Sequence, residues 1–254
     1  MLFYFTGTGN SLYVARSLEA NPISILQALK QENLHFKDDK IGVIYPVYAG
    51  ETPKIVLEFL EKATFETDYF YLILTYGKDD TDAPECIARL LEEKGRHVNY
   101  INSILMVDNY LPFFDMNEQR TMNKNIEQQI QQALQDIQNK KEEIPKATQA
   151  GRDFHASTKE IFAKNPELIN GEQITVTDKC VGCGICTKVC PRGLFYVENN
   201  KAKRKQNTCE FCLACAQNCP SKAIITKIKD ANPKARYRHE KVSLKDIIEA
   251  NQQV

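Results

Sequence analysis

Two stretches of this 254-residue chain repeat one spacing of cysteines. They read Cys180-x2-Cys183-x2-Cys186-x3-Cys190-Pro191 and Cys209-x2-Cys212-x2-Cys215-x3-Cys219-Pro220. Every cysteine of the second run follows its counterpart by 29 positions, so the region is an internal repeat. Eight of the nine cysteines therefore lie in one short part of the chain, and this part decides its fold.

The spacing of each run resembles that of bacterial-type ferredoxins, which bind two [4Fe–4S] clusters. The x2 gaps let three sulfurs from one tight loop reach the same cluster. The fourth cysteine, after the x3 gap, points the other way and binds the opposite cluster. We therefore expect two crossed ligand sets: Cys180, Cys183, Cys186 and Cys219 for one cluster, and Cys209, Cys212, Cys215 and Cys190 for the other.

Zinc sites and disulfides are weaker interpretations of these cysteines. A zinc site usually offers two separated CxxC pairs rather than three cysteines in seven residues with a fourth before proline. A disulfide framework is typical of small secreted chains. Residues Met1–Phe5 lack the basic start and long apolar stretch of a signal peptide. No apolar run approaches the roughly 18–20 residues of a membrane helix. We therefore expect a reducing cytoplasm and no membrane partner.

The amino terminus carries a second motif. The apolar run Leu2–Phe5 precedes Thr6-Gly7-Thr8-Gly9-Asn10-Ser11, and a helical pattern follows from Leu12. A strand, a loop of Gly and hydroxyl residues, and a helix amino terminus together form an anion site. The loop lacks the Lys of a triphosphate-binding loop and the third Gly of the dinucleotide fingerprint. These features suit a ligand with a single terminal phosphate.

The same loop resembles the FMN-phosphate loop of flavodoxins, whose pattern is Ser/Thr-x-Thr-Gly-x-Thr/Ser. The resemblance implies that FMN binds at Thr6, Gly7, Thr8, Gly9, Asn10 and Ser11. It also implies that Tyr48, Ala49 and Gly50 line one side of the flavin ring, and Tyr76 and Gly77 the other. The chain has no Trp, so ring stacking falls to Tyr or to apolar contacts.

Hydrophobic patterning predicts an α/β fold for the first part of the chain. With Leu2–Phe5, the expected strands are Ile23–Leu26, Ile41–Tyr45, Tyr69–Thr75 and Val98–Val107. The expected helices between them are Pro53–Ala63 and Asp82–Lys94. We expect a flavodoxin-like, doubly wound parallel sheet of five strands in the order 2-1-3-4-5.

The middle of the chain reads as helical. Asp115–Glu142 is expected to form one long helix whose apolar seam (Ile126, Ile130, Leu134, Ile137) covers the sheet or faces a second copy of the chain. Pro145 and Gly151 break the pattern, and Phe154–Ala163 is a further helix. The ninth cysteine, Cys86, is interpreted as a small buried hydrophobic residue.

These elements divide the chain into four parts. We expect residues 1–165 to form the flavodoxin-like domain for which the resemblance implies FMN binding, and residues 166–171 to form a linker. Residues 172–228 form a small α+β domain for two clusters, whose outer strands are Gln173–Thr177 and Ala223–Lys227. Residues 229–254 form a tail with a short helix at Ser243–Ala250.

Two functions remain open from the sequence. The first is an electron-transfer flavoprotein resembling the flavodoxin–ferredoxin fusions of anaerobes, in which clusters and FMN convert between one and two electrons. The second is an FMN-dependent reductase of a small organic substrate. Lys201, Lys203, Arg204 and Lys205 form a basic turn without interleaved aromatic residues, which disfavours nucleic acid. An acidic redox partner protein remains a hypothesis, and the oligomeric state stays open.

Overall fold

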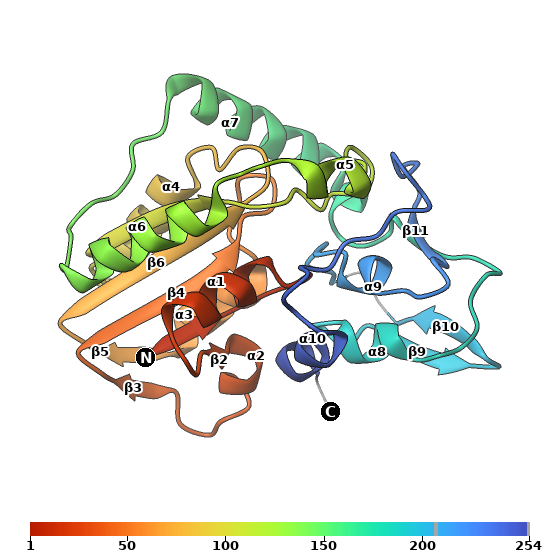
Figure 1. The fold of residues 1–254 in the computed structure, drawn as a ribbon, viewed down its shortest axis with the longest axis horizontal. Helices are drawn as coiled ribbons and strands as arrows, with labels where there is room; N and C mark the ends of the chain where they lie inside the picture. The colour runs from red at the N-terminus through yellow and green to blue at the C-terminus, as the bar shows by residue number, and fades with distance from the viewer. Residues whose placement is uncertain (206–207, 253–254) are drawn as a thin grey trace. The chain divides into compact units, whose positions relative to one another are not determined.

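A computed structural model describes residues 1–205 and 208–252, and its ribbon is drawn in Figure 1. Contacts divide the chain into two compact units. The first unit comprises Met1–Phe5, Ser11–Met106 and Asn123–Glu160. The second unit comprises Thr6–Asn10, Val107–Met122 and Ile161–Val254.

The first unit is built on a five-stranded sheet in which every pairing is parallel. Its strands, in spatial order, are β2 (Ile23–Ser24), β1 (Leu2–Tyr4), β4 (Lys40–Pro46), β6 (Tyr69–Tyr76) and β7 (Tyr100–Leu105). The predicted α/β class with a parallel five-stranded sheet is therefore confirmed. β4 and β6 are buried along nearly their whole length, as their apolar sequences require of central parallel strands.

Two further strands, which were not predicted from the sequence, lie outside the five-stranded sheet. β3 (His35–Lys37) and β5 (Thr64–Glu66) pair with each other in a separate parallel ladder. The predicted strand Ile23–Leu26 is wrong in its second half, because Ile25 and Leu26 open the short helix α2 (Ile25–Ala28). A short apolar run does not reveal by its pattern whether it is strand or helix.

Helices cover both faces of this sheet, α6 in front and α4 behind in the view of Figure 1. They are α1 (Asn10–Leu18), α3 (Lys54–Lys62), α4 (Ala83–Glu93) and α6 (Ile126–Gln138). α3 buries its predicted apolar side chains, Ile55, Val56, Phe59 and Leu60. α6 packs on β7, and the Tyr100 hydroxyl donates to Asp136 Oδ2 at 2.8 Å. The helical segment predicted at Asp115–Glu142 was expected to cover the sheet or to face a second copy of the chain. Its α6 part covers the sheet.

The single long helix predicted for Asp115–Glu142 is wrong. The segment forms α5 (Met116–Thr121) and α6, separated by residues 122–125. Asn125 adopts a left-handed conformation with φ of 49°, which interrupts the helical backbone. The buried seam of α6 runs through Ala133 rather than the half-buried Leu134.

The helix predicted for Phe154–Ala163 is longer than expected. α7 spans Gln149–Lys164 and includes Gly151, which was expected to lie in the break before the helix. Gly151 is buried there, and a Cβ at this position would lie 3.4–3.5 Å from Thr148 and Thr81. The short 3-10 helix Pro166–Leu168 follows α7.

The second unit contains two small antiparallel ladders. β8 (Ile174–Val176) pairs with β11 (Ile224–Thr226), which confirms the predicted outer strands. β9 (Phe195–Glu198) and β10 (Lys201–Arg204) form a hairpin. Its helices are α5, α8 (Ile185–Val189), α9 (Ala214–Gln217) and α10 (Leu244–Asn251). α10 begins at a capping box between Ser243 and Asp246 and packs on α8.

None of the helices within residues 1–205 and 208–252 combines the length and apolar character needed to cross a membrane.

Candidate metal centre

The eight repeated cysteines gather around two hollows in the second unit. The first hollow is lined by Cys180, Cys183, Cys186 and Cys219. The second hollow is lined by Cys190, Cys209, Cys212 and Cys215. Each hollow therefore draws three sulfurs from one run and the fourth from the other run. This is the grouping of side chains that the crossed ligand sets require.

Glycine makes the tight turn of the first run possible. Gly182 has a φ of 67°, and a Cβ at this position would lie 2.7 Å from the carbonyl oxygen of Asn200. Gly184, with a φ of 74°, stands immediately before α8. Any larger residue at Gly182 would have to displace the backbone of the β9–β10 turn. Because Gly182 carries only a hydrogen in place of a side chain, the loop that holds the three cysteines of the first hollow can lie directly against this turn.

Backbone amides point at four of the sulfurs. The amide of Ala202 donates to Cys180 Sγ at 3.3 Å, and the amide of Ala223 donates to Cys219 Sγ at 3.2 Å. At the second hollow, the amides of Leu194 and Phe211 donate to Cys190 Sγ and Cys209 Sγ at 3.4 and 3.2 Å. Such bonds stabilise negative charge on sulfur, and they tune the potential of a cluster that the sulfur binds.

The sulfurs of the second hollow lie deeper than those of the first. Burial, reinforced by the neighbouring cysteine charges, raises the pKa of Cys212 and Cys215 well above the usual thiol value. Burial also raises the pKa of Cys209 to about 11 and that of Cys186 to about 12. These thiols keep their protons in the absence of metal, so cluster assembly must release them.

Exposure separates the two hollows further. Cys183 is exposed and its neighbour Val181 is 65% exposed, whereas Cys190, Cys212 and Cys215 are all buried. The first hollow therefore meets solvent at the loop of its own run. At the second hollow three of the four cysteines are buried, and Cys209 is half-buried.

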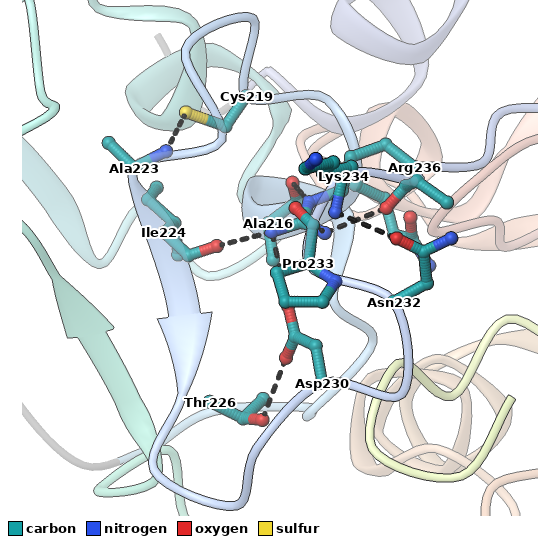
Figure 2. Close-up of polar contacts among 12 residues, drawn as sticks. Ala216, Cys219, Ala223, Ile224, Thr226, Asp230, Asn232, Pro233, Lys234 and Arg236 are labelled. Carbon is teal, nitrogen blue, oxygen red and sulfur yellow. Dashed lines mark hydrogen bonds and ion pairs between the residues drawn. The ribbon is translucent and has the colours of Figure 1, made fainter. Parts of the chain in front are cut away.

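A buried ion pair from the segment after β11 braces this region, as Figure 2 shows. Arg236 Nη2 lies 3.1 Å from Asp230 Oδ2, and both side chains are less than a tenth exposed. Arg236 Nε also donates to the carbonyl oxygen of Ala216 in α9 at 3.0 Å. Arg236 Nη2 further donates to the carbonyl oxygen of Ile224 in β11 at 3.4 Å. Arg236 thus ties the helix before Cys219 to the strand after it.

Sequence reasoning missed this anchor and a second one. Gln217 in α9 donates to the carbonyl oxygen of Asn109 at 2.7 Å and accepts from the amide of Tyr237 at 2.7 Å. The ring of Tyr110, which follows the fifth strand of the sheet, packs against Phe211 between Cys209 and Cys212, with centroids 6.1 Å apart. Asn109, Tyr110 and Tyr237 belong to no motif, and only the folded chain brings them against the variable positions of the second cysteine run.

The amino-terminal loop is buried in the second unit. The amide of Gly9 donates to Thr6 Oγ1 at 3.0 Å, and Asn109 Nδ2 donates to Thr8 Oγ1 at 2.5 Å. Asn10 donates to the carbonyl oxygen of Val107 and accepts from the Tyr237 hydroxyl at 2.6 Å. The tail covers the loop, because a Cβ on Gly9 would lie 3.0 Å from those of His239 and Val242. The polar side chains of Thr6, Thr8 and Asn10 therefore all have protein partners.

The residues expected around a flavin ring lie in the first unit. Tyr48, Ala49, Gly50 and Glu51 form a tight turn closed by two backbone bonds of 3.0 Å between Tyr48 and Glu51. Tyr76 ends β6, and the carbonyl oxygen of Gly77 accepts from Lys124 Nζ at 3.0 Å. Since β4 and β6 are parallel neighbours, both loops leave the sheet at the same edge. Ser11, the last loop residue, bonds Thr75 Oγ1 of β6 at 2.9 Å.

Comparison with known proteins bears on the cysteine region. Residues 173–241 match the family model described as a 4Fe-4S dicluster domain. An uncharacterised ferredoxin of Methanocaldococcus jannaschii is 34% identical over 74 residues, which are 28% of this chain and 96% of that relative. The chain belongs to the ferredoxin family. A second ferredoxin, from Methanothermococcus thermolithotrophicus, is 38% identical over 53 residues, which are 20% of this chain and 88% of that protein.

The ferredoxin region also resembles part of a larger redox protein. The respiratory nitrate reductase beta chain of a Bradyrhizobium species is 42% identical over 55 residues, which are 21% of this chain and 20% of that protein. No solved structure matches the chain. The predictions of 4Fe–4S binding and iron–sulfur electron transfer are confirmed by the family model and the ferredoxin relatives.

The basic turn of the ferredoxin region is largely paired within the chain. Lys201 Nζ lies 2.5 Å from Asp178 Oδ1, and Lys203 forms an ion pair with Glu198. Arg204 donates to the carbonyl oxygen of Gly171. Lys201 and Lys203 belong to the solvated β9–β10 hairpin, as expected, and their charges are partly balanced within it. A docking role for an acidic redox partner stays a prediction.

Proposed function

We propose that this ferredoxin transfers electrons between two [4Fe–4S] clusters and an FMN. The observation that carries the proposal is the grouping of eight cysteines around two hollows, each with three sulfurs from one run and one from the other. Cys180, Cys183, Cys186 and Cys219 would hold one cluster. Cys209, Cys212, Cys215 and Cys190 would hold the other.

The difference in exposure suggests separate roles for the two clusters. A partner protein can approach the first hollow at Cys183 and Val181, which are exposed. Cys212 and Cys215 are enclosed, so a cluster there exchanges electrons inside the protein. Backbone amides donate hydrogen bonds to four of the sulfurs, and these bonds would stabilise the additional negative charge of a reduced cluster. The four sulfurs are those of Cys180, Cys190, Cys209 and Cys219.

The amino-terminal loop supports the FMN half of the proposal. Thr6–Ser11 joins β1 to α1, and the first amides of a helix have no partner within it. The helix dipole favours an anion at the same place. Because Thr6, Thr8 and Asn10 bond protein groups through their side chains, the backbone amides would bind the phosphate.

Resemblance to flavodoxins assigns the ring contacts. Tyr48, Ala49 and Gly50 would contact one part of the ring, and Tyr76 and Gly77 another. The five-stranded parallel sheet is consistent with a flavodoxin-like fold, and the two loops leave it from neighbouring strands. Ala49 has a φ of 53° and Gly50 one of 85°, the left-handed geometry of a tight two-residue turn.

When bound, FMN accepts one or two electrons, whereas each cluster accepts one at a time. A chain that holds both converts between single electrons and pairs. Its residues need only keep the cofactors close, fixed in orientation and shielded from water. Tyr48 and Tyr76 would shield the ring, and the buried cysteines of the second hollow would hold one cluster away from solvent.

Flavin binding to the cluster-loaded chain tests this proposal. We expect about one FMN per chain, and binding of FMN at least tenfold tighter than that of riboflavin, which lacks the phosphate. Thr8→Val removes the bond from Asn109 that holds the loop in place, so it should loosen the loop amides, weaken FMN binding and leave the iron content unchanged. Ser17→Ala is the matched control on α1, because Ser17 Oγ donates only to the carbonyl oxygen of Tyr13 one turn earlier. Equal affinity for FMN and riboflavin would contradict the phosphate assignment.

A further inference from the structure

The ninth cysteine, outside both cluster hollows, lies in a polar cluster of the first unit. Asp82 immediately precedes α4, and Cys86 follows one helical turn later. His155 of α7 approaches them from another element. One ligand atom from each of Asp82, Cys86 and His155 lies within 4.8 Å of the others. Cys86 is therefore not the isolated hydrophobic residue that its sequence context suggested.

Each side chain is positioned by its element. Asp82 and Cys86 share one face of the first turn of α4, since the amide of Cys86 donates to the carbonyl oxygen of Asp82 at 2.9 Å. The Asp82 carboxylate makes no capping bond to α4, so it is available to His155. Its oxygen Oδ1 bonds His155 Nδ1 directly. The His155 side chain is only 4% exposed, so this bond is shielded from water.

The second ring nitrogen of His155 faces another carboxylate. His155 Nε2 lies 3.1 Å from Glu51 Oε1, and Glu51 also pairs with Lys159 at 3.0 Å. Histidines that bind a metal through one nitrogen commonly donate the other N–H to a carboxylate, which fixes the ring and its tautomer. Glu51 stands in that position relative to His155. This contact is independent of Asp82 and Cys86, and it favours a metal site over a chance cluster.

We propose that Asp82, Cys86 and His155 bind one divalent zinc-type ion, with Glu51 orienting His155 from behind. One thiolate, one imidazole and one carboxylate are the donor types that zinc prefers, and water would complete a tetrahedral site. Ligand atoms around tetrahedral zinc lie roughly 3.3–3.8 Å apart, given bond lengths of about 2.0–2.3 Å. In the structure the three ligand atoms lie within 4.8 Å of one another, and a bound ion would replace the direct bond between Asp82 Oδ1 and His155 Nδ1.

The ion would join α4, α7 and the turn at Glu51. Gly50 of that turn is packed so closely that its Cβ would lie 2.6 Å from His155 Cδ2. A metal that fixes the ring therefore also fixes the turn. Its loading requires the Cys86 thiol to lose a proton to water, so one proton is released for each thiolate bound.

A nucleophilic role for Cys86 fits the surroundings less well. Burial and the Asp82 carboxylate raise the pKa of the Cys86 thiol, although Arg89 Nη2 donates to its sulfur at 3.7 Å and opposes the rise. An activated cysteine needs the opposite, a thiolate stabilised by positive neighbours. A metal ion supplies that positive charge itself.

Zinc binding to the full, cluster-loaded chain tests the proposal, because iron then occupies the eight other cysteines. The chain is mixed anaerobically with one equivalent of zinc and desalted. Zinc and iron are then measured by mass spectrometry, and zinc-edge X-ray absorption counts the sulfur ligands. We expect about one zinc per chain, one sulfur at about 2.3 Å, and unchanged iron.

Variants assign the ligands. Cys86→Ala should abolish the sulfur signal and weaken zinc binding by more than 100-fold, and Glu51→Gln should weaken it by about 10–100-fold. Glu93→Gln is the matched control for Glu51→Gln, because it makes the same change at an exposed position of α4, away from the proposed ligands. Four sulfur ligands, unaltered zinc binding in Cys86→Ala, or no retained zinc in the parent chain would each overturn the proposal. Circular dichroism of each variant verifies its fold.

Discussion

Cys219 and Cys180 line the same hollow although 39 positions of chain separate them. Cys190 belongs to the first run of cysteines but lines the second hollow together with Cys209 of the second run. Neither run of cysteines therefore completes a set of four by itself. Folding of this region requires the two repeats to come together, and any cluster ligated in this way joins them covalently through iron.

Replacement of Cys219 by Ser should damage the cluster whose other ligands are Cys180, Cys183 and Cys186. The chain should keep the iron of the second hollow, so total iron should fall by up to half. Iron analysis and the paramagnetic spectrum of the reduced protein measure this loss. A parallel Cys186→Ser variant should affect the same cluster. Damage instead to the cluster of Cys209, Cys212 and Cys215 would disprove the crossed assignment.

Gly182→Ala should loosen the first cluster. The new Cβ would meet the Asn200 carbonyl oxygen at 2.7 Å, in addition to the cost of about 1–2 kcal/mol for a left-handed residue. Gly95→Ala is the control for the conformational cost alone, since Gly95 has a similar φ of 73° and its Cβ would meet no described atom within 4 Å. Bleaching of cluster absorbance under a chelator should be severalfold faster in Gly182→Ala. Equal rates in the two variants would contradict the role of the close contact.

Arg236→Ala should destabilise the ferredoxin region by about 3–5 kcal/mol, because it leaves the carboxylate of Asp230 buried without its counter-ion. Chemical unfolding followed by cluster absorbance measures the change. Lys245→Ala removes the exposed pair with Glu249 and should cost only about 0.3–0.5 kcal/mol. Adding Asp230→Asn to Arg236→Ala should recover part of the loss. Failure of the double variant to recover would argue against an uncompensated charge as the cause.

Asp136→Asn should destabilise the first unit by about 1–3 kcal/mol at neutral pH. Burial raises the pKa of Asp136, but hydrogen bonds from Tyr100 and Gln132 and the charge of Lys141 outweigh it and leave the pKa lowered. A lowered folded-state pKa gives stability that is present above the unfolded value of about 3.9 and is lost as pH falls through the folded value.

The difference between the parent chain and Asp136→Asn should therefore shrink as pH falls below about 4. Urea unfolding followed by far-ultraviolet circular dichroism measures it. Tyr100→Phe removes the 2.8 Å bond from the other side, so the two substitutions should be less than additive. A pH-independent difference would show that the charge of Asp136 contributes nothing.

Local patterns determined which parts of the structure the sequence could predict. The cysteine spacing is set by the reach of three sulfurs from one loop, so it is readable from sequence alone. The central strands β4 and β6 are continuous apolar runs, and their neighbours follow from the chain order. α3 shows its buried face directly in the positions of Ile55, Val56, Phe59 and Leu60.

The errors arose where tertiary contacts override local preference. Asn125 ends a helical pattern by adopting a left-handed conformation, which Asn tolerates without any marker in the pattern. Gly151 lies buried inside α7 and packs near Thr81 of a distant segment, a contact that the local pattern does not reveal. Arg236 and Asp230 pair only after α9 and β11 are in place. The cluster of Asp82, Cys86 and His155 joins positions 73 residues apart and has no local signature.

An anaerobic reductive titration of the chain loaded with iron, sulfide and FMN tests the central claim most directly. We expect an uptake of about four electrons per chain, two for FMN and one for each cluster, with flavin and cluster bands changing together. Uptake of about two electrons without flavin bands would contradict it, and would leave a two-cluster ferredoxin region joined to an α/β unit with another task.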